Sequence, residues 1–415
     1  MTGTLRVIFS TLKKTANNVK KCQQRIGSLL LIKKVLAAFI LLTMTGMAGL
    51  FAIDIELNAP QLDRSNPLAA DIQDMINSAF RDIRNELRSV VGDIDPNPQK
   101  LIGAFADSSV FASTGASLRG YQGYKTFALT VGAAGGVQLP ANVFSLLGDF
   151  EELASTAQNL LDDIIKDGDL QVGINPQILN AQLGINTRFL KGLYVGFKGG
   201  YMNLPLNLDE YQISLRTWSA GGLVNYQLIP QFRILGGILV WRGLNLGAGF
   251  IYQSTSLKLD VSLLVENDDM RFDIWEDPLG LGKITGEISN PKLNFDFIVN
   301  TYTVPLEVVT SIRLLGFLNA SLGIGADLGF GNASLDGGIK GGVNLYGFEK
   351  YGLSLQRQGS FSVTLGGESS PTLFNPKAMA SLGISAGPAI LLDIPITYYF
   401  QNDGFNVGIT LGIAL

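Results

Sequence analysis

The chain has 415 residues, of which 47% are hydrophobic and 16% are charged, whereas soluble domains contain roughly 25% charged residues. Its net charge of −4 argues against nucleic acid as a partner. The sequence contains no histidine, and its one cysteine is Cys22. These absences exclude Ser-His-Asp catalysis, imidazole metal sites and internal disulfides. We therefore expect no enzymatic activity, no cofactor and no metal.

One long apolar run, residues 35–52, follows Lys33 and Lys34. Its small-residue ending predicts a secretory signal peptide, with a true membrane anchor as the alternative. The residues before Lys33 exceed the length of an ordinary signal peptide, and we expect the true translation start near Leu31. Residues 1–52 are thus predicted to be a signal peptide with an over-long N-terminal extension, and Cys22 falls within it.

An amphipathic helix is predicted at residues 67–92. Pro67 suits a first helical turn, apolar residues recur at helical spacing from Leu68 to Val90, and Gly92 suits the end of a helix. The helix belongs to a predicted N-terminal segment, residues 53–107. This segment either plugs a barrel or packs against its periplasmic mouth.

Period-two alternation dominates residues 108–415 and predicts antiparallel strands. A helical insertion near residues 142–166 is the exception. The last strand, residues 405–415, would aggregate as a free sheet edge in water, but it fits a closed barrel in lipid. Its apolar residues alternate with small or polar ones, with Phe405, Val407, Ile409, Leu411, Ile413 and Leu415 opposing Asn406, Gly408, Thr410, Gly412 and Ala414.

The fold class that follows is all-β: a transmembrane antiparallel β-barrel of about fourteen strands, with an N-terminal amphipathic helix and one helical insertion. A periplasmic C-terminus would place the turn 401–404 and the acidic segment 266–290 outside the cell. Aromatic residues near strand ends predict interfacial girdles, with ordinary cross-strand pairs as the alternative. These residues are Trp218, Tyr226, Trp241, Tyr252, Tyr398, Tyr399, Phe400 and Phe405.

Charged side chains that alternate with apolar ones are candidates to line a water-filled pore, because ionised groups require water or partners. The alternative is that they pair across neighbouring strands and brace the wall. A Gly-x-Ser-x-Gly match at residues 383–387 has no histidine partner and lies in a predicted strand, so we do not expect a nucleophile there. The pore-lining candidates are Arg188, Lys198, Arg216, Lys258, Asp260, Asp327, Asp336, Lys340 and Asp393.

The signal peptide and the alternating strands resemble the bacterial outer-membrane β-barrels of Gram-negative and spirochaete type, as a class. The resemblance implies an outer-membrane location, contact with outer-membrane lipid, and the barrel assembly machinery as a partner. Leu415 departs from the terminal aromatic residue usual in such barrels. The leading expectation is a porin-like channel for passive diffusion of small solutes. The alternatives are a fatty-acid-transporter-like barrel for a hydrophobic ligand, with an N-terminal plug, and an adhesin or structural barrel.

Overall fold

The computed structural model describes residues 54–63, 65, 68–92, 98–114, 124, 126–138, 173–187, 190–208, 211–234, 237–262, 271–276, 283–386 and 390–415. The predicted signal peptide and the predicted helical insertion at 142–166 lie outside these residues. Strands dominate, and every pairing between them is antiparallel, which confirms the all-β antiparallel prediction. No helix among the described residues is long and apolar enough to cross a bilayer.

Ten strands form a ring, because each pairs with two ring neighbours and the path returns to its start. The prediction of about fourteen strands exceeds this number. The whole sheet has fourteen strands, because β1, β7, β9 and β13 pair with ring strands without joining the ring. In ring order the ten strands are β3 (Phe127–Gln138), β4 (Gly173–Asn186), β5 (Leu193–Leu208), β6 (Tyr211–Ile229), β8 (Leu239–Ser262), β10 (Lys283–Leu314), β11 (Leu318–Tyr346), β14 (Phe374–Ala386), β15 (Ile390–Tyr399) and β16 (Gly404–Ala414).

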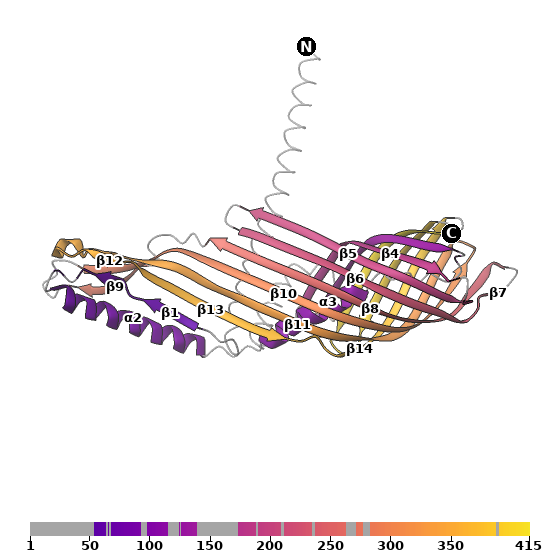
Figure 1. Ribbon diagram of the computed structural model, residues 1–415, viewed down its shortest axis with the longest axis horizontal. Helices are drawn as coiled ribbons and strands as arrows, with labels where there is room; N and C mark the ends of the chain where they lie inside the picture. Colours follow the sequence, from indigo (N-terminus) through magenta and orange to yellow (C-terminus); the bar gives the residue numbers. More distant parts are fainter. Residues whose placement is uncertain are drawn as a thin grey trace, which may run out of the picture.

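Several ring strands continue far beyond the ring (Figure 1). β10 has 32 residues and β11 has 29, whereas a tilted strand crosses a bilayer in about 9–11 residues. We call the part beyond the ring the extension. It comprises residues 202–208 of β5, 211–217 of β6, 254–262 of β8, 283–300 of β10 and 332–346 of β11, with β1 (Asp54–Asn58), β9 (Arg271–Glu276) and β13 (Gly359–Ser369). The short elements are β2 (Gln61–Leu62), β7 (Phe232–Ile234), β12 (Leu355–Arg357) and a 3-10 turn at Glu349–Tyr351.

The first described helix, α2 (Leu68–Gly92), occupies the range in which the sequence predicts one. It packs on the extension rather than in the ring (Figure 1). Its buried residues Ile72, Ile76 and Phe80 share one apolar cluster with Leu57 of β1 and Leu345 of β11. The structure therefore gives this helix no plugging role.

The final strand faces as its alternation predicts. Val407, Ile409 and Leu411 are 50–59% exposed, whereas Asn406 and Thr410 are at most 5% exposed. The apolar side chains therefore lie on the outside of the ring and the polar ones inside. The prediction for the acidic segment is wrong in part, since residues 266–290 contain β9 and the start of β10 rather than a continuous loop.

Candidate functional site

A second helix, α3 (Pro98–Thr114), occupies the mouth of the ring that opens toward the extension. The sequence predicts strands from residue 108 onward, so the second half of α3 corrects that prediction. Nearly every described side chain of the helix from Leu101 to Thr114 is buried. The helix is enclosed on all sides, because it contacts β3, β4, β8, β10, β11, β13 and β16.

Three ring glycines fit closely against this helix, two against its backbone and one against the ring of Phe111. A Cβ added to Gly136 would lie 2.2 Å from the carbonyl oxygen of Ser108, and one added to Gly173 would lie 2.1 Å from that of Ala104. A Cβ on Gly404 would meet the ring of Phe111 at 2.1 Å. Because none of these positions has room for a side chain, the ring accepts α3 only through glycine. The mouth and the helix are therefore a matched pair.

Side-chain hydrogen bonds fix α3 to opposite walls of the ring. On one wall, Ser109 and Ser113 bond to the threonine hydroxyls of β10, each at 3.0 Å. On the other wall, the Asn406 amide donates to the Phe111 carbonyl at 2.7 Å. The Phe111 ring also stacks on Tyr399 of β15, with centroids 3.9 Å apart. The partners on β10 are Thr301 and Thr303.

A buried ionic cluster lies below the C-terminal end of α3. The Lys377 ammonium contacts the carboxylates of Glu307 and Asp327, each at 2.6 Å. Asp327 also accepts hydrogen bonds from Thr114 of α3 at 3.0 Å and from Tyr399 at 2.9 Å. Lys377 and Asp327 are at most 1% exposed. The cluster thus joins three ring strands, β10, β11 and β14, and links them to the plugging helix.

Beside α3, polar side chains bridge the remaining cross-section. Gln177 of β4 donates to Gln253 of β8 at 2.6 Å, and Asn175 donates to Thr255 at 2.8 Å. β4 and β8 are not ring neighbours, since β5 and β6 lie between them. These bonds therefore cross the interior. Together with α3 they fill the ring at this level.

Asp107 anchors α3 to the rim of the mouth, where its partners lie just beyond the ends of ring strands. Its carboxylate accepts hydrogen bonds from the backbone and hydroxyl of Thr372, at 2.6 and 2.9 Å, and from the Asn402 amide at 2.7 Å. Burial raises the pKa of Asp107 to about 6, although the bonds from Thr372 partly oppose the shift. The anchor is therefore sensitive to proton concentration.

The long strands exchange their polar and apolar faces where they leave the ring. On β8, Phe250 faces outward and Gln253 inward within the ring, whereas in the extension Lys258 faces outward and Leu259 inward. β10 and β11 change in the same way. The inner apolar residues of the extension pack on the first turns of α3 around Ile102. The ring thus has a lipid-type exterior and the extension a water-type exterior.

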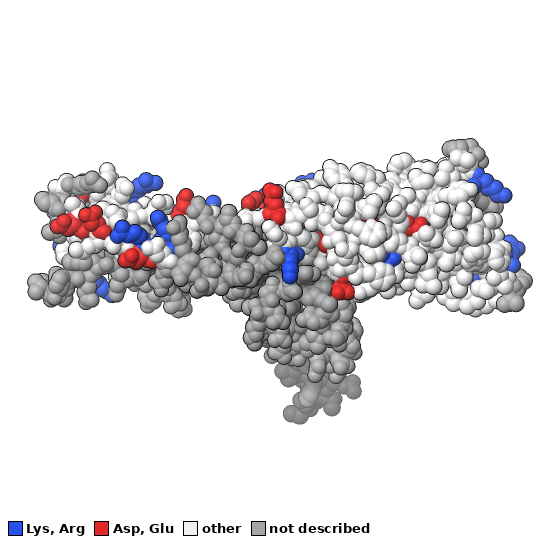
Figure 2. All heavy atoms as spheres, turned by 90° about the horizontal axis from the view of Figure 1, so that it is seen from below, with Lys and Arg blue, Asp and Glu red and all other residues white. Residues whose placement is uncertain are grey.

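Charged side chains follow the same division. Figure 2 shows lysine, arginine, aspartate and glutamate gathered over the extension and sparse on the visible face of the ring. The outer face of β11 within the ring carries Leu322, Ile324 and Phe330, all strongly exposed. An apolar belt with few charges matches a surface in contact with hydrocarbon.

Aromatic side chains mark the border between belt and extension. Trp218 lies 5.0 Å from Tyr252, which lies 4.9 Å from Tyr302, measured between ring centroids. The strand register aligns Tyr201 with Trp218, and Phe330 with Tyr302, so the row crosses five strands. Tyr399, predicted for a girdle, is instead fully buried against α3. The row has the composition of a membrane interface.

A second aromatic group lies toward the other end of the belt. Trp241 contacts Phe232 with centroids 4.9 Å apart, and Tyr226 is exposed on β6. Along β8 the interval from Trp241 to Tyr252 is about 36 Å, or about 28 Å perpendicular to the bilayer for a strand tilted by about 40°. That height is close to the thickness of a hydrocarbon core.

The nine predicted pore-lining residues fall into three groups. Lys198, Asp327 and Asp393 lie at positions whose side chains face the inside of the ring. Arg188 lies outside the described residues. The other five face outward on the extension and are exposed, which corrects the prediction that they face inward: Arg216, Lys258, Asp260, Asp336 and Lys340.

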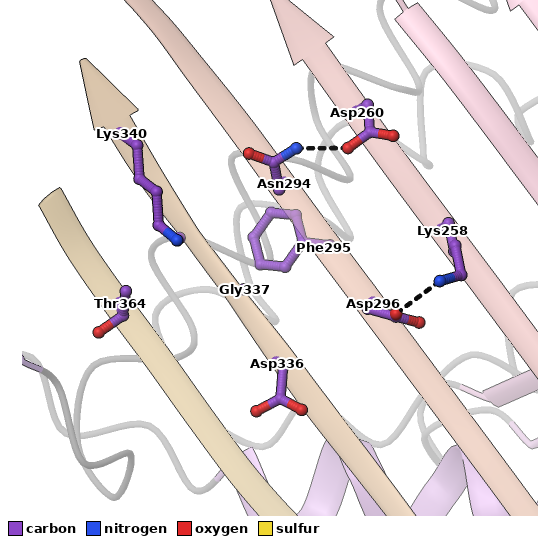
Figure 3. A pocket seen from close by; sticks show the side chains of 10 residues that line it. Lys258, Asp260, Asn294, Phe295, Asp296, Asp336, Gly337, Lys340 and Thr364 are labelled. Atoms are coloured by element: carbon purple, nitrogen blue, oxygen red, sulfur yellow. Dashed lines mark hydrogen bonds and ion pairs between the residues drawn. The ribbon is translucent and has the colours of Figure 1, made fainter. Parts of the chain in front are cut away.

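Four of these outward residues rim a groove of about 420 Å³ on the outer face of β8, β10, β11 and β13 (Figure 3). Lys258 forms an ion pair with Asp296 at 2.8 Å, and this partner raises the pKa of Lys258. Asn294 donates to Asp260. Gly338, in register with Asn294, leaves the floor of the groove open. The predicted cross-strand pairing is therefore found on the outer surface.

Sequence reasoning missed Lys377 and Glu307, which hold the interior cluster. Both lie at inner-facing positions of strands whose outer faces are apolar. The sequence signal that could have identified them is a lysine or glutamate on the face of an alternating strand that otherwise carries small residues. Within the described residues no group of three His, Cys, Asp or Glu side chains is arranged to hold a metal.

Comparison with known proteins places the chain in one family. A family model described as Lsa36-like matches residues 61–414. No curated protein matches the chain.

Solved structures similar to this chain include two autotransporter translocators and a toluene transporter. The transport unit of the autotransporter AIDA-I from Escherichia coli is 10% identical, with 76% of this chain and 98% of that chain covered and a TM-score of 0.31. The translocator domain of NalP from Neisseria meningitidis is 9% identical, covering 70% and 88%, with a TM-score of 0.29. The toluene transporter TbuX of Ralstonia pickettii is 8% identical, covering 70% and 88%, with a TM-score of 0.23.

Proposed function

The chain belongs to the Lsa36-like family, and we propose that it is a closed outer-membrane β-barrel that is sealed to solutes and anchors its extension as a display platform. Of the three functions open from the sequence, this is the structural barrel. The single observation that carries it is α3, which occupies the mouth of the ring and is bonded to both walls.

The filled interior favours this function over a porin-like channel. Passive diffusion requires a water-filled path, but the mouth is occupied by a helix, and glutamines bond across the space beside it. The Lys377 cluster adds a fully buried ionic barrier. Side chains alone fill a barrel of about eight strands, and in this slightly wider ring α3 takes up the added space at the mouth.

The polarity of the extension favours a role in water rather than in lipid. Its outer face carries the charged groove, whereas its inner apolar face is already covered by α2 and α3. No apolar surface of the extension is therefore needed to contact membrane. A hydrophobic-ligand transporter would instead use an open apolar path through the ring.

Planar-bilayer recording of the purified protein tests the proposal. The wild-type chain is expected to give no steady current. Gly136→Val is expected to produce openings, because the new side chain would displace the backbone of α3 near Ser108. Gly135→Val is the matched control, since a Cβ there has no neighbour closer than 4.0 Å. A steady open-channel current from wild-type protein would overturn the sealed barrel and restore the porin.

A further inference from the structure

We infer that the N-terminal segment, through α2, crosses the outer membrane inside its own ring, and that α3 then stops in the mouth and seals it. The inference rests on the proposed membrane location of the ring. It adds a transport activity whose only cargo is part of the same chain. The inference rests on the heights along the ring at which Phe111 and Tyr124 lie.

The chain meets opposite ends of the ring before and after α3. Phe111 lies against Gly404, where β16 begins at the extension side. Tyr124 packs with Ala128 and Tyr194 at the other end, beside the last residues of β16. Both Phe111 and Tyr124 are buried within the ring. The end of α3 and Tyr124 therefore lie at opposite ends of the ring interior.

The length of chain between Thr114 and Tyr124 matches the distance between the two ends of the ring. β16 has 11 residues, so the two levels are separated by about 35 Å along the strand and about 27 Å along an axis tilted by about 40°. The peptide units from Thr114 to Tyr124 extend at most about 36 Å. That length suffices for a direct passage, whereas leaving one mouth and re-entering the other would need far more chain.

The connections between strands identify the two sides. At the end where Leu415 lies, β10 and β11 are joined by residues 315–317, and β14 and β15 by 387–389. At the extension end, residues 139–172 connect β3 to β4 and a segment that contains β9 connects β8 to β10, whereas β5–β6 and β15–β16 have short turns. Outer-membrane barrels place short turns in the periplasm and long loops outside. The extension, with β1 and α2, is therefore on the cell surface, although an exported N-terminus starts in the periplasm.

The ring gives this segment a route of limited width. α3 shows that the mouth accommodates one helix, about 10 Å across with its side chains, and only where glycines replace side chains on the wall. An unfolded or helical segment fits this space, whereas a folded domain does not. β1 and α2 assemble on the extension only after passage, when they meet β13 and the apolar face.

Single-cysteine labelling tests the sidedness. The chain after residue 52 has no cysteine, so Asp74→Cys on α2 and Lys191→Cys in the turn between β4 and β5 are clean reporters at exposed positions. In intact cells, a membrane-impermeant maleimide should label Asp74→Cys at least tenfold more than Lys191→Cys. Permeabilising the outer membrane should equalise them. Reversed labelling, or a protected Asp74→Cys, overturns the inference.

A fused domain that is either locked by a disulfide or free to unfold tests the route. A small disulfide-stapled domain with an epitope is fused immediately before Asp54, and the matched control carries the same domain with its cysteines changed to serine. The unstapled passenger should reach the surface of intact cells, with at least tenfold more antibody binding than the stapled one. Equal surface exposure of the two passengers overturns passage through the ring.

The two proposals fail separately. A conducting wild-type ring would refute the seal, yet it would leave the labelling pattern and the passenger difference unchanged. Labelling of Lys191→Cys instead of Asp74→Cys would refute the crossing, yet a sealed ring would still show no current.

Discussion

Asp327 and Asp336 lie on the same strand, β11, but their side chains face opposite sides of the sheet. Asp327 points inward to Lys377, Tyr399 and Thr114, whereas Asp336 is exposed at the outer groove. The step from residue 327 to residue 336 is an odd number of positions, and strand side chains alternate at every step. One carboxylate is therefore buried inside the ring, and the other is exposed on the outer face of the extension.

The Lys377 cluster is expected to be the most sensitive ionic site of the ring. Lys377→Met would leave Glu307 and Asp327 buried without a counter-charge, and breaking a buried pair in this way costs about 3–5 kcal/mol. Urea unfolding in lipid vesicles measures the loss. Lys258→Met, at the exposed pair with Asp296, should leave the midpoint unchanged, and equal midpoints for both variants would contradict the cluster's role.

The position of the membrane can be measured on one strand. Ile324 is 65% exposed at the middle of the outward apolar run of β11. Ile324→Lys should lower the free energy of unfolding by about 2–4 kcal/mol, the cost of a lysine at the bilayer midplane. Ser334 faces the same side in the extension, by strand alternation. Ser334→Lys should therefore be neutral, and a similar penalty at both positions would place the extension in lipid.

The Asp107 anchor predicts a pH dependence of stability. Burial raises its pKa from 3.8 to about 6, so the folded chain holds this proton more tightly than the unfolded chain. The stabilisation is complete below about pH 4 and is lost as the pH rises through about 6. Relative to Asp107→Asn, which does not titrate, wild-type stability should fall by roughly 2–3 kcal/mol between about pH 4 and pH 7.5. Denaturant titrations at the two pH values measure it, and parallel curves would refute the shift.

α2 should affect the extension and not the seal. Ile76 is fully buried between α2 and the extension, and Ile76→Ala should destabilise this packing by about 2–5 kcal/mol. Limited proteolysis should then cut α2 faster while the bilayer current stays at zero. Asp74→Ala on the exposed side of the helix is the control. An increase in current with Ile76→Ala would restore α2 as a plug.

The outer face of the ring was predictable because the alternation of strands such as residues 405–415 reports directly on lipid contact. The interior was less predictable. The sequence prediction assumes that charged residues alternating with apolar ones face inward along the whole length of a strand. This assumption is correct for Asp327 and wrong for Lys340, because the outward face of β11 is apolar within the ring and polar in the extension.

α3 could not be recognised from periodicity. A helix surrounded by a ring has no solvent face, so small, apolar and hydroxyl residues occur around its whole circumference, as in the run from Ala104 to Thr114. Without an amphipathic stripe, the segment gives no helical signal of the kind that marks α2. Ser109 and Ser113 bond to ring threonines that lie 192 and 190 residues further along the chain, beyond the reach of a local pattern.

The β10–β11 hairpin has a mechanical consequence. Its register runs without interruption from the pair Lys292 and Lys340 in the extension to the pair Leu314 and Leu318 at the far end of the ring. Hydrogen bonds of an antiparallel ladder lie perpendicular to the strands. A force pulling the tip outward along the strands therefore loads the whole ladder in shear, so that many bonds must break together instead of one after another. Under flow or traction, the projecting part and its membrane anchor would move as one stiff rod.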